Sequence, residues 1–268
     1  MKTGSSQSWD SKNAAAWLKV CRQACKSEEV FKVFRSGYPT TAVCEFAIPS
    51  LGEKYIDVIK RTAPPDFLKD IAKYKINDLL GLPSVFTFPE VGSFAPTTLS
   101  YVKHLVGLMN EFGDLTGFDI VEIGPAYGGQ CLVISRQFKF NSYHLIDFKP
   151  VVNLAKKYLT VHGVINISTT PADKVGSLEN KQYDLLISNS AFAENSKAAQ
   201  DIYIDKIIKH CRRGYLVYNT AHFSDNDLVL PEMPYSAAVM IEKLNKYFEV
   251  RVSYDIPTPV NQPIITWG

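Results

Sequence analysis

Short apolar runs alternate with amphipathic stretches through the second half of the chain. Strands are predicted at 118–123, 142–148, 164–168, 183–188 and 214–219, and helices at 129–138, 151–161, 198–211 and 236–248. Strands that alternate with helices in this way pair in parallel. Two further strand-like runs, 249–254 and 263–267, are joined by a short Pro-rich turn without a helix. We therefore predict an α/β fold with a Rossmann-like, doubly wound sheet that ends in an antiparallel hairpin.

The first part of the chain has a helical pattern that prolines interrupt. Apolar faces predict helices at 13–26 and 65–80, and no repeat or low-complexity linker separates them from the later pattern. Residues 1–95 are therefore expected to form a mostly helical cap on a cofactor-binding domain at 96–268. A strongly patterned helix opens that domain, and Thr97 or Thr98 is expected to be its N-cap.

Composition narrows the class of protein. With 268 residues and 46% hydrophobic content, the chain can bury a full core. A net charge of +2 without a basic run does not favour nucleic acid as a partner. The five cysteines lack a C-x-x-C pair, which indicates reduced thiols. The N-terminus has no apolar signal region, and no run of about 18 apolar residues occurs. These features predict a cytoplasmic protein without a membrane span, and they leave a homo-oligomer open.

The run from Glu122 to Gln130, Glu-Ile-Gly-Pro-Ala-Tyr-Gly-Gly-Gln, joins a buried strand to a glycine-rich turn. Two interpretations fit it. Gly124, Ala126 and Gly129 match a loosened dinucleotide fingerprint, G-x-G-x-x-G. An acid followed by spaced glycines, with Ala126 at the middle position, also matches the acid-x-G-x-G-x-G turn of class I S-adenosylmethionine (SAM) methyltransferases. A carboxylate at the strand end suits the ammonium group of SAM, and the terminal hairpin favours this second interpretation. The expected cofactor-binding residues of the turn are Glu122, Gly124, Pro125, Ala126, Tyr127, Gly128 and Gln130.

Ligands of doubly wound sheets lie beyond the carboxyl ends of the strands, and polar residues follow each predicted strand. Asp147 lies 18 positions after Gly129 and is expected to bind the ribose hydroxyls, with Phe148 against the adenine. Asp173 is a candidate for the adenine amino group. Both acids could instead cap the helices that follow them. Asn189, with Ser190 beside it, is a candidate partner of the methionine ammonium.

Methyl transfer from a sulfonium is an in-line displacement, and a hydroxyl acceptor also needs a base. His222 follows the fifth strand directly and Glu194 follows the fourth, so these two are the candidate catalytic residues. A surface histidine and a solvated glutamate are the alternatives. A metal held by His222, Asp225 and Asp227 is the less favoured possibility, and we expect none. The hydroxyl of Thr98 is a further candidate cofactor contact.

Together these motifs resemble the sugar O-methyltransferases of bacterial surface-polysaccharide gene clusters, over roughly residues 30 to 255. The resemblance rests on four segments: 95–101 (Ala-Pro-Thr-Thr-Leu-Ser-Tyr), 121–130, 143–147 (Tyr-His-Leu-Ile-Asp) and 183–194. Ala126 departs from the usual glycine and Ser190 from the usual aromatic residue. The resemblance implies SAM-dependent methyl transfer to a hydroxyl of a sugar or sugar-linked acceptor during capsule or lipopolysaccharide synthesis.

Two other functions stay open. A nicotinamide-dependent oxidoreductase could use the same turn, but Tyr143, Tyr183 and Tyr215 have no lysine four positions later. A non-catalytic partner could bind SAM to stabilise an active methyltransferase.

Overall fold

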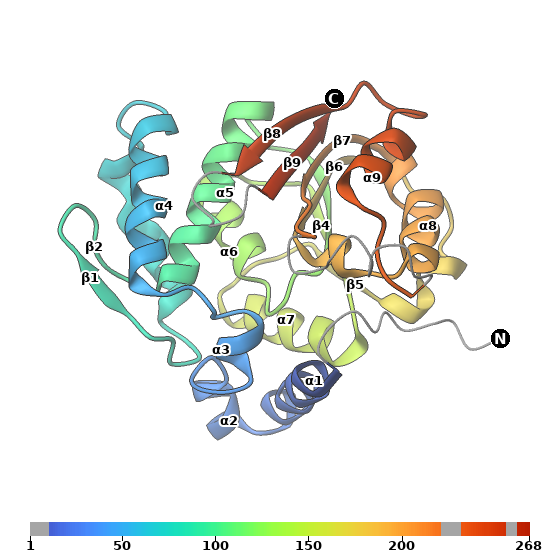
Figure 1. Ribbon diagram of the computed structural model, residues 1–268. Coiled ribbons are helices and arrows are strands. Elements are labelled where there is room, and N and C mark those ends of the chain that lie inside the picture. Colours follow the sequence, from blue (N-terminus) through green and yellow to red (C-terminus); the bar gives the residue numbers. More distant parts are fainter. Residues whose placement is uncertain (1–10, 221–231, 256–261) are drawn as a thin grey trace.

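A seven-stranded sheet forms the centre of the molecule in the computed structural model, which describes residues 11–220, 232–255 and 262–268 (Figure 1). The strand order is β5-β4-β3-β6-β7-β9-β8. The bounds are β3 Asp119–Ile123, β4 Ser142–Asp147, β5 Ile167–Pro171, β6 Tyr183–Asn189, β7 Cys211–Val217, β8 Arg251–Asp255 and β9 Gln262–Trp267. The first five pair in parallel, while β9 is antiparallel to both β7 and β8. The predicted fold class is therefore confirmed, terminal hairpin included.

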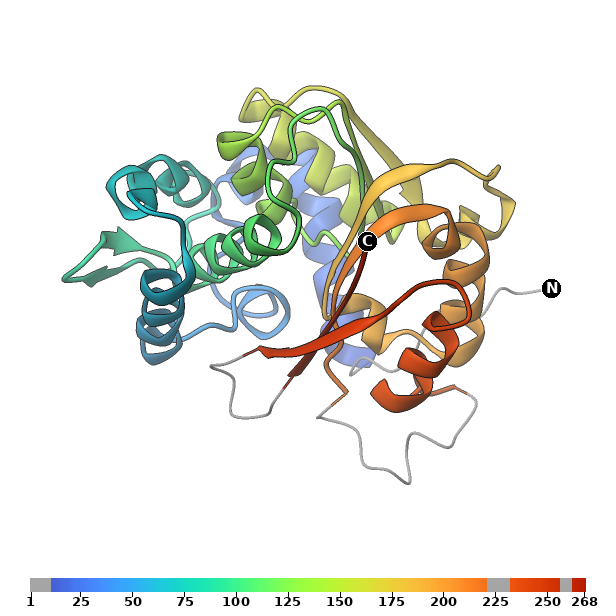
Figure 2. The same cartoon turned by 90° about the horizontal axis from the view of Figure 1, so that it is seen from above.

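Helices cover both faces of this sheet (Figures 1 and 2). Helices α5 (Pro96–Phe112), α6 (Gly129–Gln137) and α7 (Lys149–Val161) share one hydrophobic cluster, and α8 (Lys197–Lys206) and α9 (Ala237–Leu244) share the other. Alternate residues of β3 enter the two clusters, with Ile120 in the first and Val121 in the second. A strand buried on both faces is mostly apolar, and Ile120, Val121 and Ile123 give β3 this pattern in the sequence.

The N-terminal region packs on the α5–α7 face. Helix α1 lies along α7 and α4 lies along α5, and their buried side chains belong to the same hydrophobic cluster as that face. The elements are α1 Ser11–Lys26, α2 Glu28–Val33, α3 Thr40–Val43, α4 Pro49–Thr62, the 3-10 helix η1 Phe67–Asp78, β1 Phe86–Phe88 and β2 Gly92–Phe94. The β1–β2 hairpin and the 3-10 geometry of η1 are departures from a purely helical cap.

Several predicted boundaries are wrong. Strand β5 begins three residues after the predicted start, because the Val164 amide donates to the Leu159 carbonyl at 2.9 Å and belongs to the end of α7. Helix α8 ends at Lys206, and β7 then begins at Cys211. The N-cap of α5 is Ala95, not Thr97 or Thr98, because Pro96 already occupies the first helical turn.

Candidate functional site

The turn between β3 and α6 has the backbone that its glycines predict. Gly124, Ala126 and Gly128 have φ values of 75°, 49° and 94°. Ala126 thus adopts a conformation that costs a non-glycine residue about 1–2 kcal/mol. A Cβ atom on Gly124 would lie 2.0 Å from the Cβ of Ala191, in the 3-10 helix η3 (Ala191–Glu194). Close approach of η3, as well as positive φ, therefore requires glycine at the first position.

The Tyr127 side chain is fully buried and contacts the N-terminal region. Its hydroxyl donates to Glu45 Oε1 at 2.9 Å, and the Arg35 guanidinium lies 4.7 Å from the ring centroid. Only the backbone of this residue is left for a ligand. The side chain anchors the turn to the N-terminal region.

Arg35 is the centre of a buried polar network behind the turn. Its Nε lies 2.6 Å from Glu45 Oε1 and its Nη2 lies 3.6 Å from Asp78 Oδ1. The hydroxyl of Thr98 donates to Asp78 at 2.6 Å and accepts from the Asn77 amide at 2.7 Å. Thr98 is therefore committed to this network. The sequence gave no indication of the network, because its members come from segments far apart in the chain.

Three carboxyl groups lie around the ends of β3, β4 and β6. Burial raises the pKa of Glu122 to about 8, although the Tyr143 hydroxyl donates to it at 2.8 Å, and the charge of Asp147 raises it further. Burial also raises the pKa of Asp147 to about 7, although hydrogen bonds from the backbone N–H groups of Phe148 and Ala126 act to lower it. Burial and then the charge of Asp147 raise the pKa of Glu194 to about 8. For Glu122 and Asp147, no basic side chain in the described residues lowers the pKa. We call Glu122, Asp147 and Glu194 the acidic cluster.

Asn189, the last residue of β6, connects this edge of the sheet to α6 and α5. Its Nδ2 donates to Gln130 Oε1 at 3.0 Å, and Gln130 Nε2 donates to the Tyr101 carbonyl at 3.2 Å. The Oδ1 of Asn189 is buried and has no hydrogen-bond partner in the described parts of the chain. A buried amide oxygen without a donor costs about 1–3 kcal/mol, so it favours a ligand that donates.

The other predicted contacts differ in their surroundings. Phe148 is half-buried and is the N-cap of α7, where its N–H donates to Asp147 Oδ1 at 2.6 Å, and no side chain caps that helix. Asp173 is exposed in the first turn of the 3-10 helix η2 (Ala172–Ser177). Ser190 has a φ of 72°, and its N–H donates to the Val217 carbonyl at 3.0 Å. Ser190 thus joins the ends of β6 and β7.

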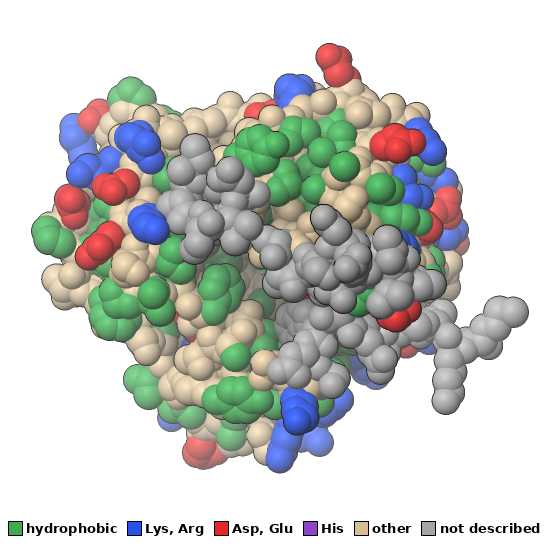
Figure 3. Space-filling view, in the orientation of Figure 1, with side chains coloured by type: hydrophobic (Ala, Val, Ile, Leu, Met, Phe, Trp, Pro, Cys, Tyr) green, Lys and Arg blue, Asp and Glu red, His purple; other side chains and the backbone are tan. Residues whose placement is uncertain are grey.

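His222 lies outside the described residues, as do Asp225 and Asp227. Within residues 11–220, 232–255 and 262–268, no group of three His, Cys, Asp or Glu side chains could hold a metal ion. Over the same ranges, no helix is both long and apolar enough to cross a membrane. The face drawn in Figure 3 is hollowed near its centre.

A scan against protein-family models and a search of curated proteins each gave no match. Several solved structures are similar to this chain at low sequence identity. The magnesium protoporphyrin IX methyltransferase of Synechocystis PCC 6803, solved with bound SAM, is 14% identical with a TM-score of 0.48, over 84% of this chain and 94% of that one. Thermoplasma acidophilum protein 1320 is 15% identical with a TM-score of 0.46, over 63% and 87%. WbdD, solved with a kinase inhibitor, is 17% identical with a TM-score of 0.44, over 60% of this chain and 37% of WbdD. Function is therefore inferred from the site itself.

Proposed function

We propose that this protein is a SAM-dependent O-methyltransferase that acts in the cytoplasm on a hydroxyl of a sugar or sugar-linked acceptor, in capsule or lipopolysaccharide synthesis. The observation that carries the proposal is the acidic cluster beside a glycine turn. Three carboxyl groups with raised pKa values lie where a doubly wound sheet binds its ligand.

The charge of the cluster distinguishes the two cofactors. Carboxyl groups whose pKa values are raised by burial and by one another are stabilised in the charged form by a nearby cation. SAM carries two positive groups, the sulfonium and the ammonium. The pyrophosphate of a nicotinamide dinucleotide is an anion, which would raise these pKa values further and gain no attraction from the acidic cluster. The electrostatics therefore favour SAM over the oxidoreductase alternative.

The described residues fit the parts of SAM. Glu122 and the unpartnered Oδ1 of Asn189 are suited to the methionine ammonium, and Asp147 is suited to the ribose hydroxyls. Phe148 is half-buried beside Asp147 and offers a ring to the adenine, with Asp173 as a partner for its amino group. When bound, SAM supplies an electrophilic methyl group. The chain orients that group and the acceptor, which is where much of the catalysis in a displacement arises.

Glu194 is the described residue best suited to accept the proton of the acceptor hydroxyl. It lies in η3, which contacts the glycine turn at Ala191, and its pKa of about 8 is close to a working pH. His222 is the second candidate base. A proton acceptor supports transfer to oxygen, because an amine needs this help less. The sugar acceptor is what the resemblance of segments 95–101, 121–130, 143–147 and 183–194 to the sugar O-methyltransferases implies.

A radiolabelled-methyl screen against nucleotide sugars and capsule intermediates tests the proposal. We expect label in a saccharide acceptor, and we expect Glu194→Gln or His222→Ala to reduce the rate while SAM binding persists. Label in none of these acceptors, together with tight SAM binding, would instead favour the non-catalytic SAM-binding partner.

A further inference from the structure

Helices α1 and α7 form a face of one charge. Helix α1 carries Lys12, Lys19, Arg22 and Lys26, helix α7 carries Lys149, Lys156 and Lys157, and neither helix contains an acid. The whole chain has 29 basic and 27 acidic residues, so these two helices depart from its near-neutral composition. The helices pack against each other, which brings both sets of charges together.

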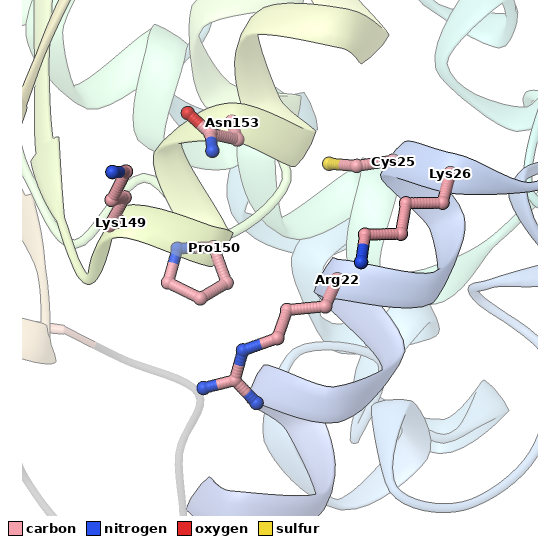
Figure 4. Close-up of a pocket in the computed structure, with 6 residues that line it drawn as sticks. All are labelled: Arg22, Cys25, Lys26, Lys149, Pro150 and Asn153. Atoms are coloured by element: carbon pink, nitrogen blue, oxygen red, sulfur yellow. The ribbon is translucent and has the colours of Figure 1, made fainter.

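A groove of about 420 Å³ lies between the two helices and is lined by Arg22, Cys25, Lys26, Lys149, Pro150 and Asn153 (Figure 4). Three basic residues and one amide lie around it and no acid does, while most of the surface inside the groove is apolar. The Arg22 side chain and the Cys25 thiol extend from α1 toward α7 in this view.

The three groove cations differ from the neighbouring Lys157. The Lys157 ammonium pairs with Glu28 and lies 4.2 Å from the centroid of the Phe31 ring. Arg22, Lys26 and Lys149 are exposed, and none of them forms an ion pair with another residue in the described ranges. Like charges around one groove repel each other, so an anion bound between them removes an unfavourable interaction.

We infer that this groove binds a phosphate-bearing ligand, at a site separate from the proposed methyl-transfer centre. Arginine and lysine at one site are the side chains that recognise phosphate, and the volume lies in the range of about 300–1,000 Å³ that small-molecule sites occupy. Pro150 and Cys25 offer an apolar surface to the part of the ligand that carries the phosphate. Lys149, which lines the groove, follows Asp147 by two positions in the chain, but the charge of the groove is opposite to that of the acidic cluster. The two sites therefore select ligands of opposite charge, and this inference does not rest on the proposed function.

Cys25 gives a direct reporter of the groove, because it is half-buried while the other four cysteines are buried. Burial raises the pKa of its thiol, so alkylation is measured at mildly alkaline pH. We expect UDP and inorganic pyrophosphate each to slow alkylation of Cys25. Loss of the alkylation signal in Cys25→Ser would confirm that the signal comes from the Cys25 thiol.

Affinity for UDP, measured by calorimetry, should fall about tenfold or more in the double variant Arg22→Gln, Lys149→Gln, which loses two charged donors. The matched control Lys69→Gln removes an exposed lysine on η1 that lies outside the groove. It should bind UDP like the wild type. An unchanged urea unfolding midpoint in every variant shows that the fold is intact.

Vesicles of phosphatidylglycerol, compared with phosphatidylcholine, identify the source of the phosphate. Protection of Cys25 by phosphatidylglycerol alone assigns the groove to a lipid headgroup, and protection by UDP assigns it to a soluble ligand. Absence of protection by UDP, pyrophosphate and both vesicles overturns the inference, as does an equal loss of affinity in Lys69→Gln.

Discussion

Replacement of Glu122 by glutamine should separate the stability of the protein from its affinity for SAM. Glu122 is 2% exposed, and its folded pKa of about 8 lies above the ordinary value of 4.5. The stability that this group contributes is fully present below pH 4.5 and is lost as the pH rises through 8. Glutamine does not titrate, and its side-chain oxygen can still accept from the Tyr143 hydroxyl.

The size of the effect follows from the interval over which only the unfolded state is ionised. Between about pH 6 and the folded pKa there are roughly two pH units, each equal to about 1.4 kcal/mol. Between about pH 6 and pH 9, the free energy of unfolding of the wild type should therefore fall by about 3 kcal/mol more than that of Glu122→Gln. Apart from Asp147, whose charge interacts with Glu122, the other titrating groups are present in both proteins and cancel in the difference.

Urea unfolding of both proteins without cofactor, at the two pH values, measures this difference. Glu53→Gln is the matched control, because Glu53 is exposed on α4, and it should follow the wild-type pH dependence. Saturating SAM should reduce the alkaline loss in the wild type and have little effect on Glu122→Gln. Equal pH dependence in the wild type and Glu122→Gln would refute the reasoning that Glu122 is buried with a raised pKa.

Three further substitutions test other parts of the site. Glu194→Gln should lower kcat/KM about 100-fold and abolish its rise with pH up to about 8, while SAM affinity measured by calorimetry changes little. Gly124→Ala should weaken SAM binding tenfold or more, because the new Cβ would collide with Ala191. Gly117 is the control: its φ is 79°, similar to that of Gly124, and a Cβ atom there would have no other atom within 4 Å. Gly117→Ala should therefore leave SAM affinity unchanged. Arg35→Met should lower the free energy of unfolding in urea by about 3–5 kcal/mol, because two buried carboxylates lose their cation.

The sheet could be predicted because most of its strands contain a short apolar run, such as Leu185 to Ile187 in β6, and glycine or proline follows several of them. Parallel pairing brings the carboxyl ends of β3, β4 and β6 to one edge of the sheet. For this reason the sequence alone could place Glu122, Asp147 and Asn189 in one predicted site. Strand β5 was misplaced because it lies at the sheet edge, where three of its five residues, Ser168 to Thr170, are polar. Apolar periodicity carries little information about such a strand.

The side-chain partners at the turn could not be predicted in the same way. Tyr127 stands in the cofactor motif, yet its ring packs under Arg35, which lies more than ninety positions earlier in the chain. Thr98 similarly pairs with Asp78 and not with the strand ends. Such contacts depend on how the N-terminal region folds over the turn, and short-range patterns do not encode that packing.

Calorimetric titration of the wild type with SAM, its demethylated product and NAD tests the central claim most directly. The account predicts that SAM and its demethylated product bind at one site per chain, that Asp147→Asn weakens both about tenfold, and that NAD does not bind. Absence of SAM binding at millimolar concentration, with NAD binding instead, would contradict the account.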